Sequence, residues 1–250
     1  MPQHPNERKK RVKINVLFEN ESLVMVNKPP GLLTLPDRFN ESLPSLKQMM
    51  EDRYDDLYTV HRLDKGTSGI ICFAKTAASH RSLSQQFEKR QVKKVYHAFT
   101  KGTPYEEHGQ IEDKIAYNMD GTVRIDNHKG KEAHSVYQVI QSFAQFAYCG
   151  IQIHTGRTHQ IRIHMAHIGY PLAYDPHYGS DQPVYLSQIK RKRFNLKKGE
   201  SERPIIDRVP LHAFSLVIQD PTSNKPIQVE CPLPKDMSAF LNQLNKWNKI

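Results

Sequence analysis

The sequence predicts an α+β domain with a mixed, mostly antiparallel sheet flanked by helices. Two observations support this fold class: β-rich runs outnumber helical stretches, and short links join them. The 250 residues are enough for one large domain with a substantial core, and no internal repeat is visible. We expect a basic flexible arm over residues 1–11 and one domain over residues 12–250.

The first elements have the pattern of a hairpin. Residues 14–18 and 22–26 are short β-rich runs, and three polar residues separate them. The KPPG sequence at residues 28–31 then predicts a stiff turn, because proline and glycine interrupt regular structure.

Two helices are expected next. Residues 42–54 place four apolar side chains on one helical face. Thr76 is a suitable N-cap for a helix over residues 76–90, in which Leu83 and Phe87 lie four residues apart. The later expected elements are strands over residues 95–100, 135–140, 148–154, 211–218 and 227–230, and a closing helix over residues 237–247.

The middle of the chain carries the clearest pattern. Residues 148–154 alternate polar and apolar side chains, which predicts a strand with one buried face. Residues 158–168 favour a helix, with Thr158 as the N-cap and Gly169 just beyond the C-terminus. A strand is the alternative there, since isoleucines alternate with polar residues at its start.

The charge of the chain favours a polyanionic partner. There are 36 Lys and Arg against 26 Asp and Glu, which gives a net charge of +10 and a pI near 9.4. Residues 187–209 form a basic insertion with few apolar side chains, which is either a solvated loop or an RNA-contacting segment. Its basic residues are Lys190, Arg191, Lys192, Arg193, Lys197, Lys198, Arg203 and Arg208.

Other classes of protein are disfavoured by composition. No apolar run is long enough to span a membrane, and the basic N-terminus lacks the apolar segment of a secretory signal. Cys72, Cys149 and Cys231 are odd in number and far apart, which argues against a disulfide framework or a cysteine zinc site. We expect a cytoplasmic monomer with no membrane association.

Three segments are rich in residues that can perform chemistry. Asp64 lies in HRLDKGTSG (residues 61–69), beside glycines that let a ligand approach the backbone, although it could simply bind turn amides. Residues 155–164 combine two arginines with a glutamine, which suits anions and bases. Tyr96 lies in a predicted strand, where it would ordinarily be a packing residue. The nearby histidines could suggest a metal, but no HExxH pattern accompanies them, so we expect none.

Taken together, these segments resemble the RluA-type family of RNA pseudouridine synthases. The similarity covers residues 14–240 in the family's order. Besides HRLDxxTSG, it includes KPPG, KVYHA at residues 94–98, TGRTHQIRIHM at residues 155–165, LHA at residues 211–213 and CPLPKDM at residues 231–237. The resemblance implies the pseudouridine synthase fold with a central RNA-binding cleft, and conversion of uridine in structured ribosomal or transfer RNA without any cofactor.

The resemblance also implies site residues. Asp64 is the essential carboxylate, Tyr96 stacks on the target base and acts late as a base, and Arg162 pairs with Asp64. Arg62 holds the extruded nucleotide or fills the space that it leaves. The other implied substrate-binding residues are His61, Thr67, Arg157, Thr158, His159 and Gln160, with scaffold roles for the last four.

Two departures from the family pattern are visible. Tyr174 stands where the family often has glycine, which leaves the local turn in question. Only about a dozen residues precede the first expected strand, so we expect no S4 RNA-binding domain. Two other functions stay open: a non-catalytic RNA-binding or chaperone protein on the same fold, and an N-glycosylase that releases the base.

Overall fold

The computed structural model describes residues 14–190, 194–197 and 199–250, so the expected basic arm and part of the basic insertion lie outside the described residues. In chain order the elements are β1 (Asn15–Glu19), β2 (Leu23–Lys28), α1 (Leu46–Glu51), β3 (Tyr58–Thr59), β4 (Ser68–Ala74), α2 (Ala77–Glu88), β5 (Lys93–Lys101), β6 (His108–Ile111), β7 (Ile115–Tyr117), β8 (Val123–Ile125), β9 (Ser135–Ser142), β10 (Phe146–Ile153), α3 (Gln160–His167), α4 (Leu186–Lys190), β11 (Leu211–Gln219), β12 (Pro226–Glu230) and α5 (Lys235–Trp247).

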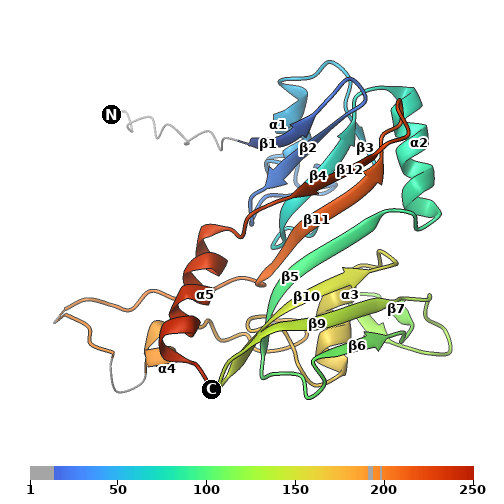
Figure 1. Cartoon of the computed structure of the whole chain (residues 1–250). Coiled ribbons are helices and arrows are strands. Elements are labelled where there is room, and N and C mark those ends of the chain that lie inside the picture. Colours follow the sequence, from blue (N-terminus) through green and yellow to red (C-terminus); the bar gives the residue numbers. More distant parts are fainter. Residues whose placement is uncertain (1–13, 191–193, 198) are drawn as a thin grey trace, which may run out of the picture.

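One long sheet organises the described chain (Figure 1). Its strand order is β1-β2-β4-β11-β5-β10-β9-β6, with β12 beside β11 and β3 beside β4. Strands β4 and β11 pair in parallel, whereas the other pairings in this sheet are antiparallel. Strands β7 and β8 form a separate hairpin. The expected α+β class with a mostly antiparallel sheet is confirmed.

The parallel contact between β4 and β11 requires a glycine. Ser68 and Gly69 pair with His212 and Ala213, and Gly69 has φ +111°. A Cβ on Gly69 would lie 2.2 Å from the carbonyl oxygen of Ala213, a distance that no real Cβ tolerates. The end of the Asp64 loop is therefore held against the C-terminal part of the sheet.

The first two helices begin where hydroxyl side chains cap them. Helix α2 starts after Thr76, whose Oγ1 accepts the amide of Ser79 at 3.1 Å, as expected. Helix α1 is shorter than the expected span of residues 42–54. Ser45 caps it and forms a capping box with Gln48, so the helix begins only at Leu46.

Helix α3 is helical as expected, but its cap differs from the prediction. His159, with φ 52°, is the N-cap in place of Thr158 and makes no side-chain cap hydrogen bond. The hydroxyl of Thr158 contacts Tyr117 Oη at 3.0 Å and caps no helix amide. Gly169 lies just past the C-terminus with φ +89°, as predicted, and the strand alternative is wrong.

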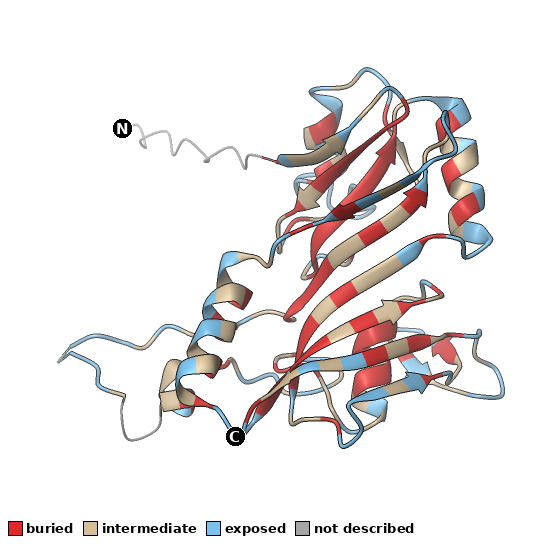
Figure 2. Cartoon of the chain, viewed as in Figure 1, coloured by how far each residue is buried: buried red, intermediate tan, exposed pale blue. Residues whose placement is uncertain are grey.

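Helices on both ends of the sheet complete the core (Figure 2). Strand β4 is buried along its whole length, and Leu83 of α2 packs in the same apolar cluster as Cys72 of this strand. At the other end, Phe240 of α5 lies 4.8 Å from Phe99 of β5, measured between ring centroids. Helices α2 and α5 thus pack on the sheet through two separate apolar clusters.

Backbone hydrogen bonds join the segments near the two ends of the basic insertion. The Val184 amide donates to Ile206 at 2.8 Å, and the Ile205 amide donates to Val184 at 2.8 Å. Lys190, at the end of α4, has its ammonium 5.4 Å from the Trp247 ring centroid. Within the described ranges, none of the helices has the length and apolar character that crossing a membrane would need.

Candidate active site

Asp64 lies on a loop between β3 and β4 that neighbouring segments hold on both sides. Before it, the Thr34 hydroxyl donates to the Leu63 carbonyl at 2.7 Å and accepts the Leu63 amide at 3.1 Å. After it, the Thr67 amide donates to the Asp64 carbonyl at 3.1 Å and closes the turn. In the described chain, no turn amide donates to the Asp64 carboxylate, so the alternative in which it only serves the turn is wrong.

The buried Lys28 side chain also holds the Asp64 loop, through hydrogen bonds to backbone carbonyls. Its ammonium is fully buried and donates to the carbonyls of Pro29, Leu32 and Lys65 at 3.1, 2.7 and 3.2 Å. Burial lowers the pKa of Lys28 to about 7, and the charge of Asp64 opposes this shift. Because three carbonyls surround the ammonium, Lys28 is tied to the loop and not available to substrate.

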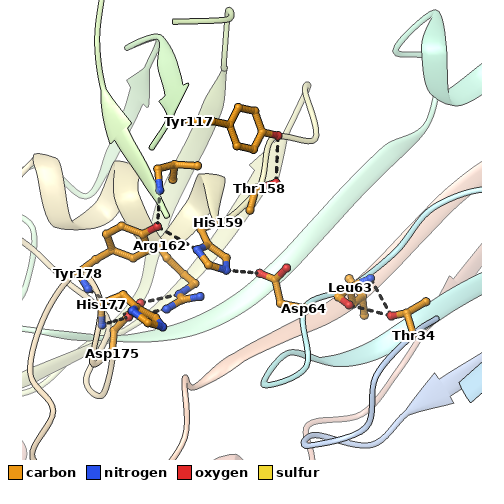
Figure 3. Close-up of polar contacts among 11 residues, drawn as sticks. Thr34, Leu63, Asp64, Tyr117, Thr158, His159, Arg162, Asp175, His177 and Tyr178 are labelled. Carbon is orange, nitrogen blue, oxygen red and sulfur yellow. Dashed lines mark hydrogen bonds and ion pairs between the residues drawn. The ribbon is translucent and has the colours of Figure 1, made fainter. Parts of the chain in front are cut away.

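His159 is the residue that contacts the Asp64 carboxylate (Figure 3). Its Nε2 lies 3.7 Å from Oδ2 of Asp64, and its Nδ1 lies 2.9 Å from Tyr178 Oη. Tyr178 Oη accepts the Val123 amide at 3.0 Å, so its own proton is free for Nδ1. The proton of a neutral His159 then resides on Nε2, the nitrogen that faces Asp64. Burial, the largest influence, lowers the pKa of His159, and Asp64 raises it.

Arg162 does not pair with Asp64, contrary to the expectation. Its Nε and Nη2 each donate to a different carboxylate oxygen of Asp175 at 2.7 Å. Both residues are buried, and Asp175 also accepts the amides of His177 and Tyr178 at 3.1 and 3.3 Å. Asp175 is buried beside the guanidinium and accepts two parallel hydrogen bonds from it. The Asp64 side chain lies on another loop and is 30% exposed.

The Arg162–Asp175 pair supports His159. The guanidinium carbon of Arg162 lies 5.0 Å from the ring centroid of Tyr178, the residue that binds His159. Figure 3 shows this series of side chains running from Asp175 to Asp64. Arg162 is thus linked to Asp64 through Tyr178 and His159.

Tyr96 and Arg62 border the cavity that contains Asp64. This cavity has a volume of about 90 Å³, and Thr67 and Arg157 also line it. Burial, with a smaller contribution from Asp64, raises the pKa of Tyr96. Arg62 is exposed and lines this cavity together with two neighbouring ones of about 490 and 270 Å³. Arg62 therefore borders all three spaces.

Several of the expected binding residues serve the scaffold. Gln160 is buried and accepts from Thr155 Oγ1 and the Arg157 amide at 2.7 and 3.0 Å, while its amide donates to His134 and Ser135. Its side chain therefore has no free donor or acceptor to offer RNA.

His61 and Thr67 belong to the walls of two adjoining cavities. His61 Nε2 accepts the Cys72 amide at 3.0 Å, and Thr67 is only 2% exposed. Burial lowers the pKa of His61 to about 3. His61 is half-buried and Thr67 is buried, and Arg157 is the partly exposed cation among the residues predicted from this region.

The histidines near α3 have protein partners. His164 binds the Ser135 hydroxyl and the Asp113 carbonyl, both at 3.0 Å, and His154 binds Gln152 at 3.2 Å. Among the described residues, no three His, Cys, Asp or Glu side chains converge as a metal site would require.

Sequence reasoning missed three contributors: Tyr178, Asp175 as the partner of Arg162, and the burial of Lys28. Asp175 and Tyr178 lie in one short turn after α3, where Tyr178 follows Asp175 by three residues. The sequence does show a carboxylate and a phenol shortly after the α3 helix. It does not show which side chains they contact, because those contacts depend on the tertiary structure.

Comparison with known proteins identifies the class. Residues 22–167 match the family model described as RNA pseudouridylate synthase. A Chlorobaculum parvum protein named as an uncharacterized RNA pseudouridine synthase is 32% identical over 97% of this chain and 78% of its own length. The ribosomal large subunit pseudouridine synthase D of Neisseria meningitidis serogroup B is 31% identical over 92% of this chain, which spans 61% of that relative.

A solved structure agrees in fold. Human RNA Pseudouridylate Synthase Domain Containing 4 superposes with a TM-score of 0.72 and 25% identity, over 92% of this chain and 93% of that one. The fold and the matched segments define a class of RNA-modifying isomerases. The chain belongs to the RNA pseudouridylate synthase family.

Proposed function

We propose that this chain converts one or more uridines of structured RNA into pseudouridine, with Asp64 as the essential carboxylate. The observation that carries the proposal is the setting of Asp64: a carboxylate on a loop held at both ends, open to the cavity that Tyr96 lines. Ribosomal RNA is the first candidate substrate, because several relatives are named as ribosomal large subunit enzymes, and transfer RNA is the second.

The reaction balances without a co-substrate, because uridine and pseudouridine are isomers. The N1–C1′ bond breaks, the base turns, C5 bonds to C1′, the C5 proton leaves, and N1 takes up a proton. Asp64 serves either as a nucleophile toward C1′ or C6, or as a base toward a ribose proton. Each of these steps needs a free carboxylate oxygen, and the contact with His159 involves only Oδ2.

Tyr96 and Arg62 would hold the extruded nucleotide. Tyr96 stacks on the base, and because its pKa is raised, its phenol stays protonated and is a poor base in the free protein. Arg62 fills the space that the uridine leaves in the RNA, since extrusion costs a few kcal/mol that new contacts must offset.

Arg162 acts in this proposal as a positioning residue. Its bidentate bond to Asp175 fixes the turn that carries Tyr178, and Tyr178 in turn sets the orientation of His159. The basic insertion, residues 187–209, adds affinity through RNA phosphates, and the protein works as a cytoplasmic monomer. The net charge of +10 supports the contact with RNA phosphates. The free cysteines support a cytoplasmic location.

The test is pseudouridine mapping by carbodiimide labelling and primer extension on ribosomal and transfer RNA from cells with and without the gene. We expect at least one site that is lost without the gene and restored by wild-type protein but not by Asp64→Asn. RNA binding should survive in Asp64→Asn, because the amide keeps the shape of the carboxylate. Free uracil in place of pseudouridine would indicate an N-glycosylase, and binding without either product would indicate a non-catalytic RNA chaperone.

A further inference from the structure

A second cavity adjoins the one that contains Asp64. Its volume is about 490 Å³, compared with about 90 Å³ for the Asp64 cavity. Ligand sites in proteins commonly measure roughly 300–1,000 Å³, so the larger space could hold a nucleotide. Both cavities are lined by Arg62, Tyr96 and Arg157, and a ligand in one would therefore lie directly beside a ligand in the other.

The walls of the larger cavity are cationic. Besides Arg62 and Arg157, they include Arg90 and Lys94, against a single acidic residue, Glu88. Lys94 and Tyr96 alternate on β5, so both side chains lie on the same face of the strand. Four basic side chains around one nucleotide-sized space suit a phosphate.

Arg90 has an unusual backbone for its residue type. It follows the C-cap of α2 with φ 58°, in the left-handed region where glycine is the usual residue. Arg90 lines the cavity, and its guanidinium lies 3.5 Å from the carboxylate of Glu132. Both side chains of this pair are largely exposed, so a phosphate could replace Glu132 at little cost.

The same cavity offers flat surfaces. Phe87 stacks on His61 with centroids 4.7 Å apart, and His154 stacks on His134 at 4.5 Å. Phe87, His61 and His154 line the cavity. Bases stack on aromatic rings without regard to sequence, whereas a phosphate alone would not need such walls.

We propose that this cavity binds a second nucleotide of the RNA, one that flanks the target uridine, with its phosphate toward Arg90 and Lys94 and its base against His154. The inference rests on the proposed function, because it places the target uridine at Asp64. It makes the cavity a specificity site: a substrate must have a flanking nucleotide that can leave its stack together with the target.

The test pairs protein variants with altered RNA. The RNA is the shortest transcript in which wild-type protein forms pseudouridine, remade with an abasic residue at each position flanking the uridine. Arg90→Gly removes the guanidinium and suits the left-handed backbone, and Lys94→Gln removes the ammonium. Lys89→Ala and Lys93→Gln are matched controls, because both lysines are exposed neighbours that do not line the cavity.

We expect Arg90→Gly and Lys94→Gln to raise KM about tenfold, and the two controls to leave KM unchanged. One abasic position should raise KM for the wild type but add little in Arg90→Gly, since the two changes would remove parts of one interaction. Unchanged KM in both cavity variants, or full additivity at every flanking position, would overturn the inference while the function stands. A wild-type protein that forms no pseudouridine in any RNA would instead refute the proposed function itself.

Discussion

Nε2 of His159 lies 3.7 Å from Oδ2 of Asp64, and Tyr178 contacts the opposite nitrogen of the same ring (Figure 3). The carboxylate thus faces a neutral N–H donor and not a guanidinium. At 3.7 Å this contact is longer than a hydrogen bond, so Asp64 is not held in the tight ion pair that would weaken a nucleophile or base. The alignment of this donor depends on Tyr178 and, behind it, on Arg162 and Asp175.

Tyr178→Phe should lower kcat about tenfold and change KM little, because it frees the His159 ring to turn or to change tautomer. The measurement is tritium release from RNA labelled at uridine C5, over a range of pH. Tyr117→Phe is the control: it also removes a tyrosine hydroxyl, but from a residue that is 52% exposed and whose hydroxyl contacts Thr158. Equal losses in both variants would mean that Tyr178 does not position His159.

Asp175→Asn should cost about 3–5 kcal/mol of unfolding free energy, because it leaves the buried Arg162 charge without its counterion. Urea unfolding followed by circular dichroism measures this difference. Asp236→Asn breaks a similar bidentate pair with Arg208, but the Asp236 side chain is 32% exposed, so solvent should limit its cost. A smaller effect at Asp175 than at Asp236 would contradict the structural role of the buried pair.

His61 should make the protein sensitive to acid. Its pKa in the folded protein is lowered from 6.5 to about 3 by burial, so the folded state binds fewer protons than the unfolded state between these values. The stability that the neutral ring contributes is complete above pH 6.5 and is lost as pH falls through about 3. His61→Gln can still accept the Cys72 amide but does not titrate.

The unfolding free energy of the wild type should therefore fall more steeply than that of His61→Gln below pH 6.5, by at most about 1.4 kcal/mol per pH unit. Urea titrations of both proteins at several pH values give the two slopes. Parallel slopes would show that His61 takes up a proton as readily in the folded as in the unfolded chain.

Gly69→Ala should cost about 3 kcal/mol or more, because the added methyl group meets the backbone of Ala213. Gly121→Ala is a matched control with φ +82° and open space around the new atom, so only the backbone conformation opposes it, at about 1 kcal/mol. Midpoints of urea unfolding compare the two. Equal midpoints would mean that the contact between β4 and β11 can relax.

Patterns among neighbouring residues predicted several of the helices and strands correctly. The hairpin of β1 and β2, the Thr76 cap of α2 and the helix at residues 160–167 all follow from nearby residues. Helix α1 is shorter than expected because a capping box at Ser45 outweighs the longer apolar stripe. The short strands β6, β7 and β8 escaped prediction, since two of the four residues of β6 are exposed and the two other strands have three residues each.

The candidate site was predictable in its members but not in its pairings. Asp64, Tyr96 and Arg62 line one cavity, as a shared site requires. The predicted partner of Arg162 was wrong. Asp64 and Asp175 were both available, and only the tertiary structure decides which carboxylate contacts the buried guanidinium. Tyr178 contributes through its contact across space to His159, which no spacing along the chain encodes.

The position of β11 between β4 and β5 has a consequence for synthesis on the ribosome. Residues 211–219 are made late, yet they fill the middle of the sheet. Until they emerge, β4 and β5 each expose an unpaired edge, and the loop of Asp64 has no strand to lie against. The nascent chain must therefore protect two open strand edges after residues 1–210 have been made, and such edges favour aggregation until β11 appears.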